Sequence, residues 1–310
     1  MDIEDGMNAC NVAKPSEIAK APRVSIGMPV YNGAKFIHEA LDSLLSQTFT
    51  DFELIISDNA SIDETEAICR GYAAKDSRIH YVRQVKNFGA SANFQFVLDE
   101  AVGEYFMWAA ADDSQDKELI EQLVSILLED EKIVLATADV ENIDEYGGKM
   151  YREFIDAIRV KDAKRNCKAN RKLFFRNPTT NIFFSIYGLY RTDVAKATEL
   201  NYKNMVKNAA GSEIPLLAQV SLQGLIVSIP KPLKIYRRHK KSLYHMEAKG
   251  MSSFEKLSNQ INISYVLFII IIRSAMRMFD KIILLNVVVF DFFRILLRTS
   301  AIIITKYVSN

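Results

Sequence analysis

Two adjacent aspartates, Asp112 and Asp113, end a run of apolar and aromatic residues that begins at Tyr105 (YFMWAAADD). Such a run predicts a buried parallel strand over 105–113 that delivers both carboxylates into a cleft, because ligands of open α/β sheets bind outside the carboxyl ends of the strands. Two carboxylates there suit a divalent metal ion that holds a phosphorylated ligand. The alternative is structural: Asp113 and Ser114 also precede the helical pattern DKELIEQLVSILLED (116–130), and both are good helix N-caps.

Two other predicted strands end in polar residues. The runs VSIGMPVYNG (24–33) and FELIISDNAS (52–61) end in Tyr31-Asn32 and in Ser57-Asp58-Asn59. Further strands are predicted over 79–84 and 133–144. The first four strands are separated by helical patterns over 35–47, 63–74 and 87–101. This alternation predicts the α/β class, a mostly parallel sheet flanked by helices. The three polar strand ends then form one crevice, which favours a metal site over a helix cap at Asp112 and Asp113.

Composition allows one large domain with an appendage. The chain has 310 residues, of which 49% are hydrophobic and 25% charged. Residues 1–150 hold 28 acidic and 12 basic residues, whereas residues 151–310 hold 10 acidic and 27 basic ones. A basic and apolar second half predicts an anionic surface as a partner. The three cysteines, Cys10, Cys69 and Cys167, have no metal-ligand or disulfide spacing, as expected for reduced cysteines in a cytosolic chain.

Two common nucleotide-binding motifs are missing from the sequence. No G-x-G-x-x-G follows the first strand and no G-x-x-x-x-G-K-[ST] occurs, which disfavours a dinucleotide-binding fold and a P-loop. The motifs present are SIGMPVYNG, ISDNASIDET, KNFGASANF, the acidic pair, GSEIPLLAQVSLQG (211–224) and IPKPLKIYRRH (229–239). In this order and spacing, from about Val24 to His239, they resemble the family 2 glycosyltransferases, which are inverting enzymes with the Rossmann-like GT-A fold.

The resemblance implies how the nucleotide of a sugar donor would bind. Asp58 would accept a hydrogen bond from the base, and Asp112 would lie near the ribose. The other nucleotide-binding positions implied by the motifs are Pro29, Val30, Tyr31, Asn87 and Arg238.

The resemblance also implies a metal site and a catalytic base. Asp113 and His239 would be ligands of Mn²⁺ or Mg²⁺, and Glu213 would take the proton of the acceptor. Alternatives remain open: His239 as a packed or solvated side chain, and Glu213 as an acidic residue in the first turn of a helix. Two positions depart from the family pattern. Ala110 stands where the D-x-D-D motif begins, and Glu213 replaces the usual aspartate.

The implied function is metal-dependent, inverting transfer of a sugar from a nucleotide-sugar donor to a hydroxyl group. The acceptor would be a glycan or a lipid-linked sugar in cell-surface polysaccharide synthesis. The metal would neutralise the departing diphosphate, and a carboxylate would activate the acceptor hydroxyl. Two alternatives are a catalytically silent, glycosyltransferase-like membrane scaffold and a nucleotidyltransferase on a related sheet. The latter would need a glycine-rich basic first turn, which GMPVYNGAK lacks.

The basic second half raises the question of membrane contact. Eight basic residues lie between Tyr151 and Arg176. They could form a solvated surface, or a lid that recruits an anionic lipid-linked acceptor. No nucleic-acid-binding motif accompanies them. NIFFSIYGLYRTD (181–193) predicts a buried strand with a turn at Gly188. From Phe254 onward, apolar runs are interrupted by charges such as Arg273 and Arg277, typical of helices lying in a membrane interface. The alternatives are packing on the protein or on a second subunit, and true spans.

These patterns divide the chain into a lead-in over 1–22, a GT-A domain over 23–245 and amphipathic helices over 254–310. The expected location is cytoplasmic, peripheral at the inner face of a membrane. A homo-oligomer is compatible with the sequence.

Overall fold

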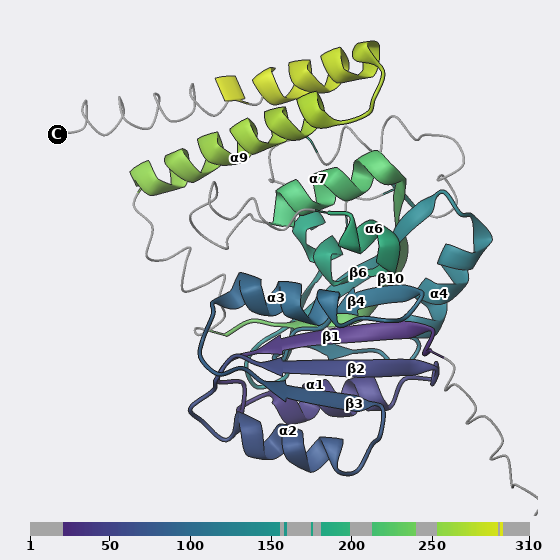
Figure 1. Ribbon diagram of the computed structural model, residues 1–310, viewed down its shortest axis with the longest axis vertical. Coiled ribbons are helices and arrows are strands. Elements are labelled where there is room, and N and C mark those ends of the chain that lie inside the picture. The colour runs from purple at the N-terminus through teal and green to yellow at the C-terminus, as the bar shows by residue number, and fades with distance from the viewer. Residues whose placement is uncertain are drawn as a thin grey trace, which may run out of the picture.

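The computed structural model describes residues 21–155, 158–159, 175, 181–198, 213–239, 253–290 and 292–293. One twisted sheet runs through the middle of these residues with helices on both faces (Figure 1). Two helices near the carboxyl end of the chain form an additional outer layer. The predicted basic run between 151 and 176 falls almost entirely outside the described residues.

The first part of the chain builds four parallel strands and their connecting helices. The strands are β1 (Val24–Val30), β2 (Phe52–Asp58), β3 (Ile79–Arg83) and β4 (Tyr105–Trp108), and the helices are α1 (Ile37–Leu45), α2 (Thr65–Ala73) and α3 (Ala90–Asp99). β1 lies between β2 and β4 and is parallel to both. Every residue of β2 and β4 is buried, as expected for strands that helices cover on both faces. The predicted α/β class and element order are confirmed here.

The second part of the sheet contains a reversed strand. Its elements are α4 (Leu119–Glu129), β6 (Ile133–Ile143), β9 (Leu189–Arg191), α6 (Thr192–Lys196) and β10 (Leu225–Arg237). β9 is antiparallel to both β4 and β6, and β10 is parallel to β6, so the order is β3-β2-β1-β4-β9-β6-β10-β5. Three short strands pair at its margin: β5 (Ser114–Gln115) with β10, β7 (Lys149–Glu153) with β6 and β8 (Ile158–Arg159) with β10.

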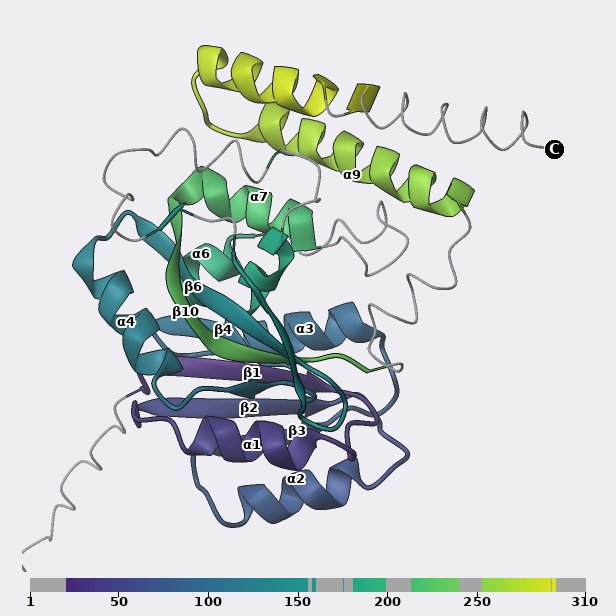
Figure 2. The same ribbon diagram turned by 180° about the vertical axis from the view of Figure 1, so that it is seen from behind.

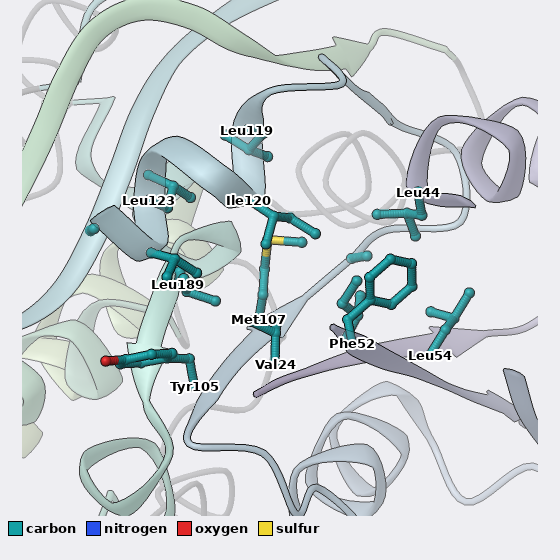
Figure 3. Packing of buried hydrophobic residues seen from close by; sticks show 14 of the residues in the cluster. Val24, Leu44, Phe52, Leu54, Tyr105, Met107, Leu119, Ile120, Leu123 and Leu189 are labelled. Atoms are coloured by element: carbon teal, nitrogen blue, oxygen red, sulfur yellow. The ribbon is translucent and has the colours of Figure 1, made fainter. Parts of the chain in front are cut away.

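Alternation along β4 divides the core between the two faces of the sheet, because successive side chains of a strand point to opposite faces. Tyr105 and Met107 join a cluster under α1 and α4 (Figure 3). Phe106 and Trp108 join the cluster on the other face, with α3 and α7 (Glu213–Gln223). The Trp108 ring meets Tyr190 edge-on at 5.4 Å, which fixes β4 against β9.

Two predicted strands are shorter than the sequence pattern suggests. β4 ends at Trp108, so the acidic pair lies in the loop that follows and not on the strand itself. In the segment 181–193, a 3₁₀ helix over Asn181–Tyr187 comes first and only Leu189–Arg191 is a strand. Gly188 joins the two at a point where a Cβ would lie 2.6 Å from the carbonyl oxygen of Ala136. The tight approach of this turn to β6 leaves room for a strand only after Gly188.

The tail folds back onto the domain. α9 (Ser253–Arg273) packs on α7, and a further helix over 278–290 packs on α9. Ile263, Val266 and Ile270 of α9 are buried in a third apolar cluster together with Ile214 and Ala218 of α7. The expected alternative of packing on the protein is therefore confirmed for one face of the tail. Among the described helices, none combines the length and apolar content that a membrane span requires.

Candidate active site

The carboxyl ends of β1 and β2 lie side by side at one edge of the sheet, and we call them and the loops that follow the nucleotide wall. Val30 and Asp58 are paired in register, and Asn59 N donates to the carbonyl oxygen of Val30 at 2.8 Å. Each strand is followed by a residue with positive φ, Asn32 at 53° and Ala60 at 61°. Asn32 N donates to Ser61 Oγ at 2.8 Å, which ties the two loops together. The predicted convergence of these polar strand ends is observed.

Asp58 is buried at this wall and organises it. Its Oδ1 atom accepts a hydrogen bond from Ser61 N at 2.8 Å. Its Oδ2 atom accepts from Tyr81 Oη at 2.8 Å and from Arg83 Nη1 at 3.1 Å. These three donors hold the carboxylate in a fixed orientation. Tyr31, in the loop after β1, is half exposed. Contact between Asp58 and a nucleotide base stays a prediction, and a base would have to share this network.

Two asparagines from the KNFGASANF motif complete the wall. Asn87, a predicted nucleotide ligand, is exposed, and its Oδ1 accepts from Asn59 Nδ2 at 2.9 Å. Asn93 is buried; its Nδ2 donates to the carbonyl oxygen of Ser57 at 2.8 Å and its Oδ1 accepts from Ser57 Oγ at 2.6 Å. Asn93 was not predicted as a site residue. Its signal was present in the motif, because an asparagine on the buried face of a helix needs polar partners.

The acidic pair lies in the loop after β4, the strand that neighbours β1 in the sheet. Asp113 is buried, and its Oδ1 accepts a hydrogen bond from the backbone N of Arg237 at 2.9 Å. The helix-cap alternative is therefore wrong. Glu118 stands at the N-cap of α4, and Asp116 Oδ1 accepts from its backbone N at 2.9 Å.

Arg237 holds the pair from the end of β10, a contact that the sequence did not predict. Its side chain is 3% exposed, with Nε donating to the carbonyl oxygen of Asp112 at 3.2 Å. The guanidinium group also pairs with Glu39 and lies over the Phe36 ring at 5.0 Å. His239 contacts the same ring at 4.8 Å, and its Nε2 lies 2.8 Å from Asp112 Oδ2. The predicted metal ligand His239 is thus bonded to the acidic pair itself.

Arg238, the predicted nucleotide ligand, contacts β6 and β7 among the described residues, and not the acidic pair. Its Nε donates to Asn142 Oδ1 at 2.8 Å, and its guanidinium group lies 5.3 Å from the Tyr151 ring and 5.4 Å from the Tyr236 ring. Neighbouring residues of an extended chain point in opposite directions, so only one of two adjacent arginines can reach the acidic pair. That rule is the sequence signal that could have separated Arg237 from Arg238.

A lysine lies buried behind the pair. Lys234 Nζ donates to Thr137 Oγ1 at 2.7 Å and to the carbonyl oxygen of Phe184 at 2.8 Å. Burial lowers the pKa of this ammonium group to about 7, against the charges of Asp113 and Asp139, which raise it. Burial also raises the pKa of the Asp113 carboxyl well above its usual range, and the charge of Asp112 adds to this.

Glu213 is the first residue of α7 and is half-buried. Its charge and those of Asp112 and Asp113 all act on Tyr187, whose hydroxyl pKa is raised first by burial and then by these carboxylates. The structure therefore brings Glu213 and the acidic pair within electrostatic reach of one side chain. Tyr187, at the end of the 3₁₀ helix, was not predicted from the sequence.

A divalent metal ion fits the acidic pair when a ligand completes its coordination. Among the residues that the structure describes, no group of three or more His, Cys, Asp or Glu side chains is arranged to hold a metal. Mg²⁺ is often bound by only one or two carboxylates, with substrate phosphates and waters as its other ligands. Asp112, whose side chain is 34% exposed, and Asp113 behind it supply such a set.

A mostly parallel sheet with the reversed strand β9 between β4 and β6, and an acidic pair beyond the fourth strand, defines the GT-A class of fold. Solved structures agree. S. aureus TarS in complex with UDP-GlcNAc has a TM-score of 0.64 and 18% identity over 85% of this chain and 70% of that one. The mannosyltransferase PcManGT from Pyrobaculum calidifontis, in complex with GDP-Man and Mn²⁺, has a TM-score of 0.53 and 14% identity over 94% and 81%.

The sequence comparison then gives the family. Residues 25–197 match the model of glycosyl transferase family 2, and the chain belongs to this family. An uncharacterized glycosyltransferase of Rickettsia typhi is 35% identical over 132 residues, which are 42% of this chain and 40% of that protein. Glycosyltransferase GlyG of Streptococcus pneumoniae is 29% identical over 41% of this chain and 42% of its own length. The match thus spans about two fifths of these two relatives.

Proposed function

We propose that this chain is a metal-dependent, inverting glycosyltransferase that moves a sugar from a nucleotide-sugar donor to a hydroxyl group of a glycan or lipid-linked acceptor, in cell-surface polysaccharide synthesis. The observation that carries the proposal is the acidic pair, which Arg237 fixes in the loop after β4, the strand that neighbours β1. Family membership supports it, as do the UDP-GlcNAc and GDP-Man complexes of the structural neighbours.

The loops after β1 and β2 and the acidic pair have separate tasks in this proposal. The nucleoside binds along the loops after β1 and β2, where Tyr31 offers an exposed ring and Asn87 an exposed amide. The diphosphate binds next to Asp112 and Asp113, which would hold Mn²⁺ or Mg²⁺. The bound metal supplies a positive charge that stabilises the departing diphosphate.

Proton removal is assigned to Glu213. The acceptor hydroxyl is a weak nucleophile, so a carboxylate within hydrogen-bond reach must take its proton as the new bond forms. Direct attack on the anomeric carbon from the side opposite the diphosphate inverts its configuration and needs no sugar–enzyme intermediate. Glu213 lies at the amino end of α7, and its charge acts on Tyr187 together with the charges of Asp112 and Asp113, which supports this assignment.

A donor screen tests the reaction class. The full chain is incubated with a panel of nucleotide sugars, with and without Mn²⁺, and release of nucleoside diphosphate is measured. We expect release from at least one donor only with metal, and loss of that release in Asp113→Asn. Asp99→Asn, an exposed carboxamide substitution on α3, is the control and leaves release unchanged.

The outcomes separate the candidate functions. A chain that binds a nucleoside diphosphate but releases none from any donor, with or without an acceptor, is a silent scaffold. Ala110 leaves this alternative open. Release of inorganic diphosphate from a nucleoside triphosphate would instead identify a nucleotidyltransferase. Metal-independent release in both wild type and Asp113→Asn would refute the metal site.

The role of Glu213 needs a separate measurement. Glu213→Gln keeps the size of the side chain but cannot take a proton, and general base catalysis contributes typically ~10²–10⁴-fold. We therefore expect a fall of this size in the transfer rate at saturating donor and acceptor, with nearly unchanged donor affinity. If the transfer rate stays near that of wild type, another group is the base. An unchanged rate together with a loss of about 1 kcal/mol in stability is the result expected of a residue that only stabilises the helix end.

A further inference from the structure

The two carboxyl-terminal helices have an outer face that nothing in the described structure covers. We call α9 and the helix over 278–290, with the turn between them, the tail hairpin (residues 253–290). Its inner face packs on α7 through the third apolar cluster. Two opposite views show the hairpin as the layer farthest from the sheet, with α7 between them (Figures 1 and 2).

The outer face is apolar as well. On α9 the exposed residues Tyr265, Phe268 and Ile272 recur at spacings of three and four and so form one stripe along the helix. On and just after the second helix the exposed large apolar residues are Met278, Phe279, Ile282, Val289, Phe290 and Phe293. A surface helix of a soluble protein normally carries polar residues on its outer side. A contiguous apolar surface of this kind marks an interaction site.

Basic residues gather where the two helices meet. Arg273 and Arg277 are exposed at the turn between the two helices. Lys281 follows on the second helix, where its Nζ donates to the carbonyl oxygen of Ile272 at 2.8 Å. Both arginines line an open cavity of about 620 Å³ between the turn and the end of α7, together with Ser274, Gln223 and one carboxylate, that of Asp280. Three cations against one carboxylate therefore lie at this turn, on the element that carries the apolar stripe.

We propose that the outer face of the tail hairpin docks on the surface of an anionic lipid bilayer, with its apolar stripes in the acyl boundary and Arg273 and Arg277 on lipid phosphates. Charge selects this partner: an amphipathic element with apolar and basic residues binds anionic lipid interfaces, and each basic residue near such a surface adds to the attraction. The hairpin holds four basic and two acidic residues, so a second copy of the chain would bring the same net positive charge to this face. The inference goes beyond glycosyl transfer and does not depend on it.

Vesicle binding by the full chain is the test. The protein is sedimented with phosphatidylcholine vesicles and with vesicles that also contain phosphatidylglycerol. We expect clear binding to the anionic vesicles and weaker binding to the neutral ones. Raising the salt from about 0.1 M to about 1 M shortens the Debye length from ~10 Å to ~3 Å and should remove only part of the binding, because the apolar insertion remains. Failure of the intact chain to bind anionic vesicles overturns the proposal.

Charge reversal at the turn tests the phosphate contacts. The double variant Arg273→Glu/Arg277→Glu should bind anionic vesicles at least about 30-fold more weakly, from the loss of two surface cations. The control is Lys75→Glu/Lys117→Glu, which changes the net charge equally at exposed sites on α2's end and before α4. Equal losses in both double variants would mean that only net charge matters, and the assignment to the turn would be wrong.

The apolar stripe is tested at exposed positions, where substitution leaves the fold intact. Phe268→Ser/Phe279→Ser should reduce binding to both kinds of vesicle, whereas Val102→Ser/Leu128→Ser, at exposed sites outside the hairpin, should not. Unfolding curves confirm that each variant is folded. Sedimentation velocity without lipid tests whether a second copy of the chain covers this face instead. A wild-type dimer that becomes a monomer in the Phe268→Ser/Phe279→Ser variant would show that a second copy covers this face, and would overturn the lipid proposal.

Discussion

At the scale of single residues, Arg237 sets the position of the two acidic residues, Asp112 and Asp113. Asp113 is buried and bonded to the backbone of Arg237, while the Arg237 side chain holds the carbonyl oxygen of Asp112. Ala110 removes one carboxylate from the family motif, and Arg237 places a fixed positive charge directly beside the two that remain. The geometry of the pair is thus set by β10 as much as by the loop that carries it.

Replacement of Arg237 should therefore affect the metal site more than the fold. Arg237→Lys keeps a positive charge but loses the planar group that contacts Asp112 and Glu39 together. We expect the affinity for a nucleoside diphosphate to fall about tenfold or more with Mn²⁺ present, and to change little without it; calorimetry measures both. The matched control is Arg152→Lys, whose guanidinium group pairs with the buried Asp139. It should lower stability without changing the metal-dependent affinity. Equal binding by Arg237→Lys and wild type would contradict the role.

Lys234 should make stability depend on pH. Burial lowers its pKa from 10.5 to about 7 in the folded chain. Between these values the unfolded chain binds a proton that the folded chain does not, so the free energy of unfolding rises with pH, by up to ~1.4 kcal/mol per unit. Urea unfolding at pH 7, 8 and 9 should show this rise relative to Lys234→Met. The exposed Lys231→Met is the control and should parallel wild type. A constant difference between wild type and Lys234→Met across this range would refute the assignment.

At the scale of elements, the reversed strand β9 joins the two halves of the sheet. It separates β4 from β6 and β10, and it pairs with both of its neighbours through only three residues. The turn before it approaches β6 so closely that only glycine fits at position 188. A small side chain there would displace β9 from the sheet.

Two glycine substitutions of opposite expected sign test this packing. Gly188→Ala would place a Cβ 2.6 Å from a backbone oxygen, and overpacking of this kind costs about 1–3 kcal/mol. Gly71→Ala has nothing within 4 Å of its new Cβ and lies in α2, where alanine should add about 0.5–1 kcal/mol. Chemical denaturation measures both. A Gly188→Ala variant as stable as wild type would show that the turn can move away from β6.

At the scale of the whole molecule, the tail hairpin is both part of the core and a surface. Its inner face covers Ile214 and Ala218 of α7, the helix that also begins with Glu213. Its outer face carries the apolar stripes and the basic turn. The hairpin therefore links the helix of the proposed base to the proposed lipid surface without contributing a described residue to the crevice.

Removal of the hairpin should weaken the domain without abolishing nucleotide binding. A chain ending at residue 252 exposes the apolar face of α7, so we expect a lower melting temperature than for the full chain. Mn²⁺ with UDP or GDP should still raise it, because ligand binding to the folded state adds stability. Leu267→Ala in the full chain is the graded comparison, with an expected loss of about 2–5 kcal/mol. An unchanged melting temperature after truncation would mean that the hairpin does not stabilise α7.

The sequence by itself determined the parallel half of the fold, the convergence of the strand ends and the position of the acidic pair along the chain. These follow from local periodicity and from the rule that parallel strands end at one edge. Tertiary structure alone decided that Asp113 bonds to Arg237 and does not cap a helix, because the two residues are 124 positions apart. It also decided which face of α9 is buried. The helix is apolar on both sides, so periodicity could not say which side meets α7.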